Sequence, residues 1–226
     1  MGPRVGRVSA RMESSPQQDA RYPAFLSSER AMTDKGSPQE LEDRLALTAP
    51  EHTLRGFFFT GVFEQVRPLG DPELLRRCVD AAGGDRFMFF FSYPVGAMTR
   101  LLYTAAWALR GPQGDFGQVM RHLGQEIAPD YLESGAGRVL VLLSGGEPRR
   151  LLNGFPSAYR TAVRHGDCLV TWMGPNAARI TIQGSPLPAE YYEGAVRGVF
   201  ACTKVAQVAT VARQVSLLLT EVDVSW

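Results

Sequence analysis

The stretch GDCLVTWMGPNAARITIQ, from Gly166 to Gln183, decides the fold of this protein. Apolar residues occupy every second position from Cys168 to Trp172 and again from Ala178 to Ile182. Alternation with a period of two is typical of a strand with one buried face. Gly174-Pro175-Asn176 separates the two runs and supplies turn residues. The stretch therefore predicts a β-hairpin.

The chain downstream continues the β pattern around one helix. Residues 188–202 have helical spacing, and Gly194 and Gly198 stand four apart, so another backbone can approach closely on that side. Residues 207–213 and 218–226 alternate again. The C-terminal part is thus predicted to run strand, strand, helix, strand, strand.

Upstream of Gly166 the apolar spacing is helical. Asp71-Pro72 starts a helix that Gly83-Gly84 ends, because Asp caps a helix N-terminus and glycine a C-terminus. Predicted helices cover residues 72–82, 94–109, 115–129 and 148–163, the last with a break at Pro156, and Leu54–Thr60 is predicted as a short extended segment.

Arg138 to Ser144 fits two structures. The run VLVLL followed by SGG could be a buried strand leading into a phosphate-binding loop. The chain has no G-x-G-x-x-G or G-x-x-x-x-G-K-[ST] motif and no repeated strand-helix-strand alternation, which favours a helix. The predicted class is α+β, with an N-terminal helical layer packed on a C-terminal four-stranded antiparallel sheet.

Residues 1–45 are rich in Ser, Pro, Gln, Arg and Asp and have no sustained apolar period. Such a segment buries too little surface to offset the entropy cost of ordering. We expect a disordered extension over 1–45 and a single α+β domain over 46–226. Translation could begin at Met1, Met12 or Met32, because a start at Met32 removes no periodic element.

The charge balance and the apolar runs limit the kinds of partner that the protein could have. The 226 residues carry 24 basic and 23 acidic side chains, a formal net charge of +1, which predicts neither a nucleic acid nor a strongly anionic membrane as a partner. No apolar run reaches the about 18 residues of a membrane span, and none follows the N-terminal arginines as a secretory signal requires. We expect a cytoplasmic protein without a membrane span.

The three cysteines, Cys78, Cys168 and Cys202, are far apart and lack a C-x-x-C pair or histidines at metal-ligand spacing. This argues against a disulfide framework and against a metal site. Buried thiols acting as small apolar side chains are favoured over reactive ones.

Several short motifs share their order and spacing with one known family. They are Gly61-Val62-Phe63, Tyr93-Pro94, His122-Leu123-Gly124, Gly135 to Arg138, Leu187 to Gly194, Gly198 and Val222 to Trp226. On these residues the chain from about Leu54 to Trp226 resembles a myxobacterial paralogous family of unknown function, with members of about 200 residues.

The element order also looks like a wider fold. It is similar to that of heme nitric-oxide-binding sensors, vinyl-reductase-type small-molecule-binding domains and subunits of the vesicle-tethering transport particle. The resemblance implies a protein that binds a ligand or a partner chain. Fold alone does not fix function.

A heme site would need a histidine on a helix, and His122 is the histidine that falls in a helical segment. Tyr131 to Arg138 lacks the spacing of the Y-x-S-x-R motif that holds the heme propionates in the resembling sensors. His122 adjoins Arg121 and lies near Gln118 and Gln125, which favours a solvated or capping histidine. Heme therefore stays an alternative, and we expect no bound cofactor.

A ligand pocket between helices and sheet is a second candidate site. Arg100 could contact an anion there, but an arginine stacked on an aromatic ring needs no ligand, and aromatic residues usually form core. The candidate pocket residues are Arg100, Tyr103, Trp107, Trp172 and Tyr191, with Tyr159 and Tyr192 beside them.

Catalytic patterns are absent from the sequence. Ser144 lacks the G-x-S-x-G elbow and an assignable histidine-acid pair, and the helically spaced Glu126, Asp130 and Glu133 are typical of a solvated face. The first hypothesis is a noncatalytic binding or regulatory module, a small-molecule sensor or protein-interaction adaptor in signalling, which could form a homodimer. A heme or other small-molecule carrier is the second hypothesis, and an enzyme with an unrecognised site is the third.

Overall fold

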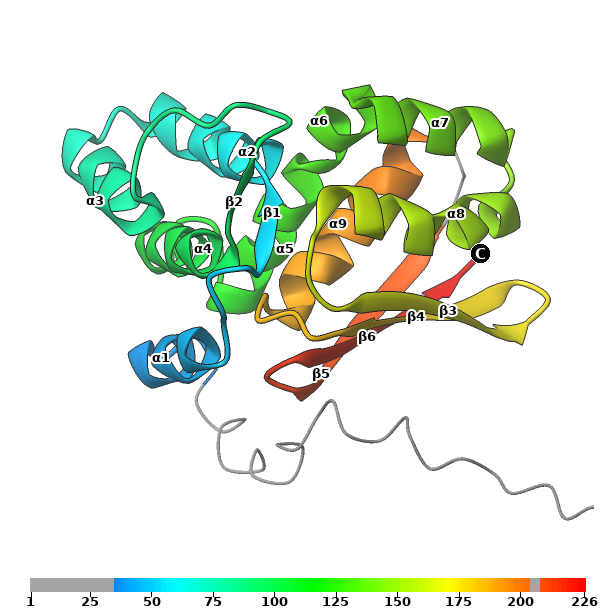
Figure 1. Ribbon diagram of the computed structural model, residues 1–226. Helices are drawn as coiled ribbons and strands as arrows, with labels where there is room; N and C mark the ends of the chain where they lie inside the picture. Colours follow the sequence, from blue (N-terminus) through cyan, green and yellow to red (C-terminus); the bar gives the residue numbers. More distant parts are fainter. Residues whose placement is uncertain (1–34, 204–207) are drawn as a thin grey trace, which may run out of the picture.

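A four-stranded antiparallel sheet forms one side of the molecule in the computed structural model, which describes residues 35–203 and 208–226 (Figure 1). Its strands are β3 (Asp167–Gly174), β4 (Ala177–Gln183), β5 (Ala209–Ser216) and β6 (Leu219–Ser225), in the order β3-β4-β6-β5. Ile180 pairs with Val170 of β3 and with Val222 of β6, so the apolar positions of neighbouring strands share one face. The predicted hairpin and the α+β class are confirmed.

Two helices cover the apolar face of this sheet. The helix α8 (Pro148–Ala162) packs on β3, and α9 (Ala189–Cys202) packs on β5 and β6 (Figure 1). The opposite face carries charged side chains, of which Arg179 pairs with Asp223 at 2.6 Å and with Glu221 at 3.2 Å. The alternation in the sequence thus separates a buried face from an exposed one, which carries these ion pairs together with exposed apolar side chains such as Leu169 and Val211.

A further group of helices lies beyond α9 and completes the predicted helical layer. Its elements are β1 (Thr53–Arg55), α2 (Phe57–Val66), the 3₁₀ turn η1 (Arg67–Leu69), α3 (Pro72–Ala82), β2 (Ser92–Pro94), α4 (Val95–Leu109) and α5 (Phe116–Glu126). Asp71 and Asp115 cap α3 and α5 as predicted, each accepting from backbone N–H groups of the first turn. The helix α5 packs along α9 and so joins this group to the sheet.

The ambiguous segment before Ser144 is a helix. After the short helix α6 (Ala128–Glu133), Ser134 caps α7 (Gly135–Ser144). The Leu140 side chain of α7 packs against Gly154 of α8, where a Cβ atom would lie 2.3 Å from Leu140 Cδ1. The alternative of a buried strand leading into a phosphate-binding loop is wrong, because helix-to-helix packing determines this segment.

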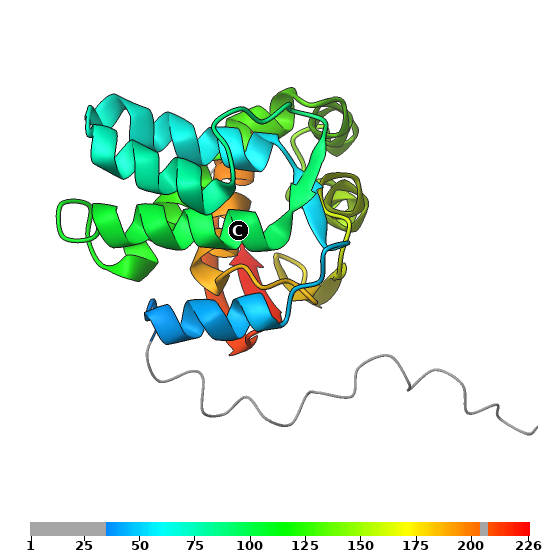
Figure 2. The same cartoon turned by 60° about the vertical axis from the view of Figure 1, so that its left-hand side comes forward.

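A helix occupies part of the segment that was predicted to be disordered. Ser37 caps α1 (Pro38–Ala46), which Figure 2 shows beside the β5–β6 end of the sheet. The prediction is therefore wrong for residues 38–45, because Leu41 and Arg44 are buried against the rest of the protein. Residues 1–34, with the three candidate start methionines, lie outside the described residues.

Two smaller predictions also differ from the structure. The segment Leu54–Thr60 is extended only as far as Arg55, because α2 is buried around most of its circumference, with Phe57 and Phe59 in the core on different sides of the helix. The helix α8 continues through Pro156 without the predicted break, since its neighbours α7 and β3 hold it along its length. Among residues 35–203 and 208–226, no helix combines the length and apolar character that crossing a membrane requires.

Candidate functional site

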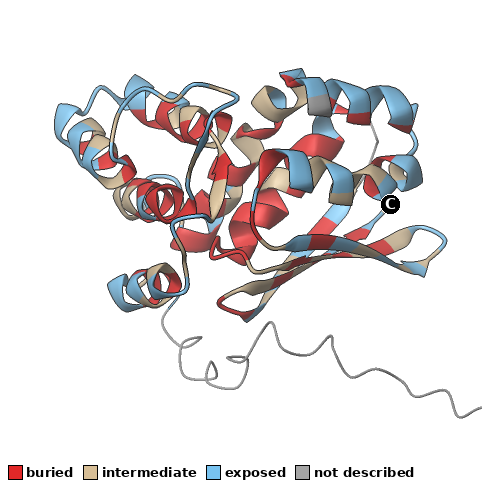
Figure 3. Ribbon diagram, in the orientation of Figure 1, coloured by how far each residue is buried: buried red, intermediate tan, exposed pale blue. Residues whose placement is uncertain are grey.

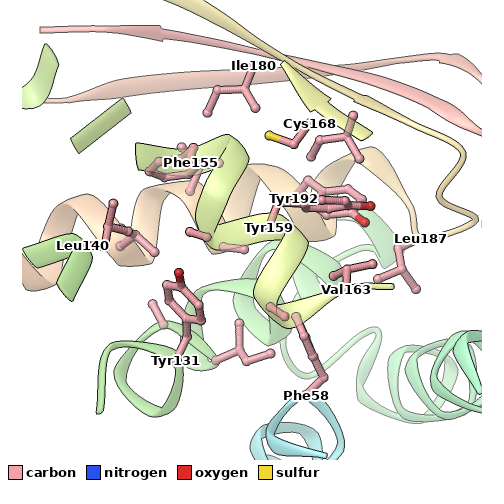
Figure 4. Close-up of a pocket in the computed structure, with 18 of the residues that line it drawn as sticks. Phe58, Tyr131, Leu140, Phe155, Tyr159, Val163, Cys168, Ile180, Leu187 and Tyr192 are labelled. Carbon is pink, nitrogen blue, oxygen red and sulfur yellow. The ribbon is translucent and has the colours of Figure 1, made fainter. Parts of the chain in front are cut away.

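An apolar cavity of about 110 Å³ lies where the elements around α8 meet (Figure 4). Its wall is built from α2, α6, α7, α8, α9 and the inner face of β3 and β4. The side chains that line it include Phe58 from α2, Leu140 from α7, Phe155 from α8 and Ile180 from β4. Small residues, namely Ala158, Ala162 and Ala195, occupy positions where larger ones would fill the space. The sheet and both helical groups therefore line one apolar space.

Two tyrosine hydroxyls at the cavity wall are hydrogen-bonded to other groups. The Tyr192 hydroxyl lies 2.6 Å from Ser185 Oγ, and the Tyr159 hydroxyl donates to the His165 carbonyl at 3.3 Å. Burial raises the pKa of Tyr192 to about 12 and raises that of Tyr159 well above its usual value. Both phenols are neutral near pH 7 and hydrogen-bonded within the wall, and they offer no ionised group to the cavity.

The Tyr131 hydroxyl differs, because it is buried and has no hydrogen-bond partner among residues 35–203 and 208–226. Figure 4 shows the hydroxyl end of Tyr131 directed among the lining side chains. Burial raises the pKa of this phenol, so it too is neutral near pH 7. An unsatisfied buried hydroxyl costs roughly 1–3 kcal/mol. Tyr131 is thus a hydrogen-bond donor at the wall of an apolar space.

Cys168 contributes a thiol to the same wall. Burial raises its pKa to about 12, so the reactive thiolate is scarcely populated near neutral pH. The prediction of buried thiols is confirmed for Cys168 and Cys78. It is wrong for Cys202, which is exposed because Val199 and Phe200 take the buried positions in the last turn of α9.

Behind the cavity wall, His165 is buried beside His52, with ring centroids 5.4 Å apart. Its Nδ1 lies 3.2 Å from the Thr53 carbonyl oxygen, so Nδ1 carries the proton of the neutral ring and donates it. Burial, opposed by this hydrogen bond and aided by His52, lowers the pKa of His165 to about 4.

This pKa predicts a stability that depends on pH. The unfolded chain binds a proton at His165 near pH 6.5, whereas the folded chain does so only near pH 4. The stabilisation is therefore complete above about pH 6.5 and falls by up to about 3 kcal/mol as the pH drops toward 4. The free energy of unfolding can be measured by urea unfolding at several pH values across this window. It should depend less steeply on pH in His165→Gln than in wild type. The exposed His122→Gln variant is the control, and an unchanged slope in His165→Gln would contradict the assignment.

The predicted pocket residues lie in several places, and none of the five lines this cavity. Arg100 is exposed and its Nε lies 3.4 Å from the Ala81 carbonyl oxygen. Tyr103 is core, with its ring against Trp107, and the Trp107 indole donates to the Gly36 carbonyl at 2.6 Å. Tyr191 is buried within α9. Of the wider aromatic set, the structure brings Tyr159 and Tyr192 to the cavity.

The predicted arginine-aromatic stacking occurs at another pair. The Arg149 guanidinium lies over the Trp172 ring, 4.3 Å from its centroid, and Arg149 also donates to the Pro175 carbonyl at 3.1 Å. Trp172 also makes an edge contact with Trp226. Trp172 therefore lies at the hairpin end of the sheet and forms no part of the cavity.

His122 is on the outer side of α5 with a side chain that is 43% exposed. Its Nδ1 lies 3.8 Å from Glu126 Oε1, and its neighbours are Arg121 and Gln125 in a shallow polar groove between α5, α9 and β5. These surroundings match the interpretation of His122 as a solvated histidine. His122 does not face the apolar cavity.

Sequence reasoning missed most of the cavity. Tyr131 was considered only as part of a motif that did not fit, and Phe58 only as part of an extended segment. The signal that could have pointed there is the set of alanines on two helices facing the sheet, because small residues opposite one another leave space.

The fold and the cavity define a class: an α+β protein with an apolar space between a helical layer and an antiparallel sheet. The chain belongs to the family described as Protein of unknown function (DUF2378), whose model matches residues 47–226. The predicted membership of a family of unknown function is thus confirmed, and the myxobacterial source stays a prediction.

Solved structures share this fold at low sequence identity. The Fe(II) unliganded H-NOX protein from K. algicida is 9% identical, with a TM-score of 0.50 over 76% of this chain and 96% of that chain. A doubly substituted Tt H-NOX is 10% identical, with a TM-score of 0.50 over 76% and 95% of the two chains. A structure from work on heme redox potential and porphyrin distortion is 11% identical, with a TM-score of 0.50 over 76% and 97%.

These similarities establish the fold alone, and they confirm the predicted likeness to heme nitric-oxide-binding domains at that level. The comparison with curated proteins found no match.

The residues at the cavity do not fit a heme. Heme iron is held by a histidine, a thiolate, a methionine or a tyrosinate. No histidine or methionine is among the described residues that line the cavity, and burial keeps the Cys168 thiol and the tyrosines protonated. A space of about 110 Å³ is also below the roughly 300–1,000 Å³ of pockets for drug-sized ligands, and a porphyrin is larger than such ligands.

Proposed function

We propose that this protein is a noncatalytic binding module for a small uncharged molecule that has an apolar body and one hydrogen-bond acceptor. The observation that carries the proposal is the unpartnered Tyr131 hydroxyl at the wall of an otherwise apolar cavity. A ligand carbonyl or hydroxyl oxygen would accept the hydrogen bond from Tyr131, while its apolar part would replace empty space. The ordinary role of such a module is sensing or carrying the bound molecule.

The size of the cavity limits the ligand. An engineered apolar cavity of about 150 Å³ holds benzene. A cavity of about 110 Å³ therefore supports a ligand of comparable size, or the apolar end of a longer one. The apolar wall disfavours an ionised ligand, because a buried charge without a partner is costly.

The absence of an activated group at the wall supports a noncatalytic role. The groups that could act as nucleophile or proton carrier are Cys168 and three tyrosines, and burial keeps all four protonated near pH 7. Neutral groups of this kind hold and orient a ligand. A carrier or sensor therefore accounts for the site better than an enzyme does.

Binding of a matched pair of probes tests the proposal. We expect cyclohexanone to bind more tightly than methylcyclohexane, as measured by NMR titration of the full chain. Tyr131→Phe should weaken cyclohexanone binding roughly two- to tenfold, the value of one hydrogen bond, and leave methylcyclohexane binding unchanged. Native mass spectrometry of protein purified from its own host would then report the retained molecule.

A cavity-filling substitution gives the second arm of the experiment. Ala195→Leu places three more carbon atoms in the space and should abolish binding of both probes without unfolding the protein. Ala201→Leu, on the exposed side of the same helix, is the matched control and should bind like wild type. Wild-type affinity in Ala195→Leu would contradict this location of the site.

A further inference from the structure

The helix α7 is apolar on two opposite sides. Leu140 faces inward, where it packs against Gly154 of α8 and lines the cavity. Val139, Leu142 and Leu143 face outward and are 54%, 79% and 69% exposed. Their spacing of three and four places them on one stripe of the helix. A helix that is apolar all round is normally buried on all sides, but no part of the chain that the structure describes covers the outer stripe of α7.

Figure 3 shows the outer side of α7 in the exposed colour, along the edge of the molecule opposite the sheet. Surface leucines that stand singly are common, but three large aliphatic side chains on one exposed helical stripe indicate a contact surface.

The charge around this stripe is net positive. The span of α6, α7 and α8 with Val163 and Arg164 has five arginines against three acidic residues, Asp130, Glu133 and Glu147, and Glu147 pairs with Arg150 at 3.0 Å. All five arginines are exposed, and Arg138, Arg149 and Arg150 lie on α7 or in the first turn of α8, directly after the turn that follows Leu143. Five basic and three acidic side chains give this region a net charge of +2, against +1 for the whole chain.

We propose that the outer stripe of α7 and the surrounding arginines dock the protein on an anionic lipid surface. Leucine side chains would enter the boundary between headgroups and acyl chains, and the arginines would contact the lipid phosphates. This is peripheral binding by one helix face and needs no membrane-spanning helix. It replaces the expectation that the near-neutral net charge gave, because a membrane responds to the local charge of the face that it meets.

The charge pattern favours a membrane over a second copy of the chain. In a twofold dimer built through this face, the same patch would meet itself, and arginines would face arginines. Like charges at an interface are unfavourable, whereas an anionic surface attracts arginines. The inference stands whether or not the cavity binds a ligand.

Vesicle flotation of the full chain tests this proposal. We expect binding to vesicles of phosphatidylcholine mixed with phosphatidylglycerol, much weaker binding to phosphatidylcholine alone, and loss of binding as the salt concentration rises. Leu142→Gln combined with Leu143→Gln should weaken binding roughly tenfold or more, because two apolar side chains no longer enter the lipid. Val211→Gln combined with Leu169→Gln, on the exposed face of the sheet, is the control and should bind like wild type.

A second pair of variants separates local from total charge. Arg138→Gln with Arg150→Gln should weaken binding to the mixed vesicles, whereas Arg77→Gln with Arg110→Gln removes the same charge from the opposite helices and should not. Equal effects of the two pairs would overturn the proposal, as would absence of binding by wild type. Analytical ultracentrifugation that shows self-association lost in the leucine variant would also overturn it, in favour of a second copy of the chain.

Discussion

Arg44→Met is expected to destabilise the protein by about 3–5 kcal/mol, the usual result of breaking a buried ion pair by removing one partner. Arg44 is 1% exposed and every one of its N–H donors has an acceptor. Its acceptors are the Glu40 carboxylate, the carbonyls of Pro186 and Leu217, and the Gln214 side chain. The substitution would leave Glu40 as a buried charge without its partner.

Urea unfolding followed by circular dichroism gives the measurement. The control is Arg76→Met, because Arg76 also pairs with two carboxylates, Glu73 and Asp80, but lies on the solvated side of α3, where water screens the pairs. We expect little change in the control. An Arg44→Met protein as stable as the control would show that α1 contributes nothing to the folded body.

The second large effect is expected at the crossing of α5 and α9. A Cβ atom on Gly194 would lie 1.9 Å from the Arg121 carbonyl oxygen, and one on Gly124 would lie 2.0 Å from the Tyr191 carbonyl oxygen. In both helices the nearest atoms to the added Cβ are backbone atoms, so a change of side-chain rotamer cannot relieve the clash. Gly194→Val should therefore cost more than about 3 kcal/mol, at or beyond the upper end of overpacking effects.

The control for this crossing is Gly135→Ala, at the first position of α7. No atom lies within 4 Å of a Cβ built there, and the residue is helical. Alanine should be neutral or stabilise the protein by about 0.4–1 kcal/mol. Thermal unfolding of both variants gives the comparison, and a Gly194→Val protein that melts with wild type would refute close backbone contact between the helices.

The sequence predicted the elements whose signal is local. Asp71 and Asp115 identified two helix starts, because a capping carboxylate acts within one turn. The pair Gly194 and Gly198 indicated close approach of another backbone, and α5 makes that approach. The hairpin from Asp167 to Gln183 followed from alternation alone.

The sequence did not predict the cavity, and it favoured a solvated His122 while leaving heme binding as an alternative. The cavity depends on which side chains of seven elements meet, and periodicity reports only that a face is apolar. Aromatic residues such as Tyr103 and Trp107 fit a pocket as well as a core by composition, and only packing places them in the core. The side of α5 that carries His122 is likewise decided by the packing of α5 on α9.

The N-terminal helix and the basic edge also show the difference between what composition predicts and what the folded structure contains. Composition predicted disorder up to residue 45, but Arg44 bonds to Leu217, which is 173 positions away, and no local pattern records such a partner. The net charge of the chain predicted no attraction to an anionic surface, because a total charge does not show where the charged residues lie. The sequence by itself determined the elements and their class, since these depend on neighbours within a few turns. Tertiary structure alone decided the cavity and the buried arginine, since these depend on residues that only folding brings together.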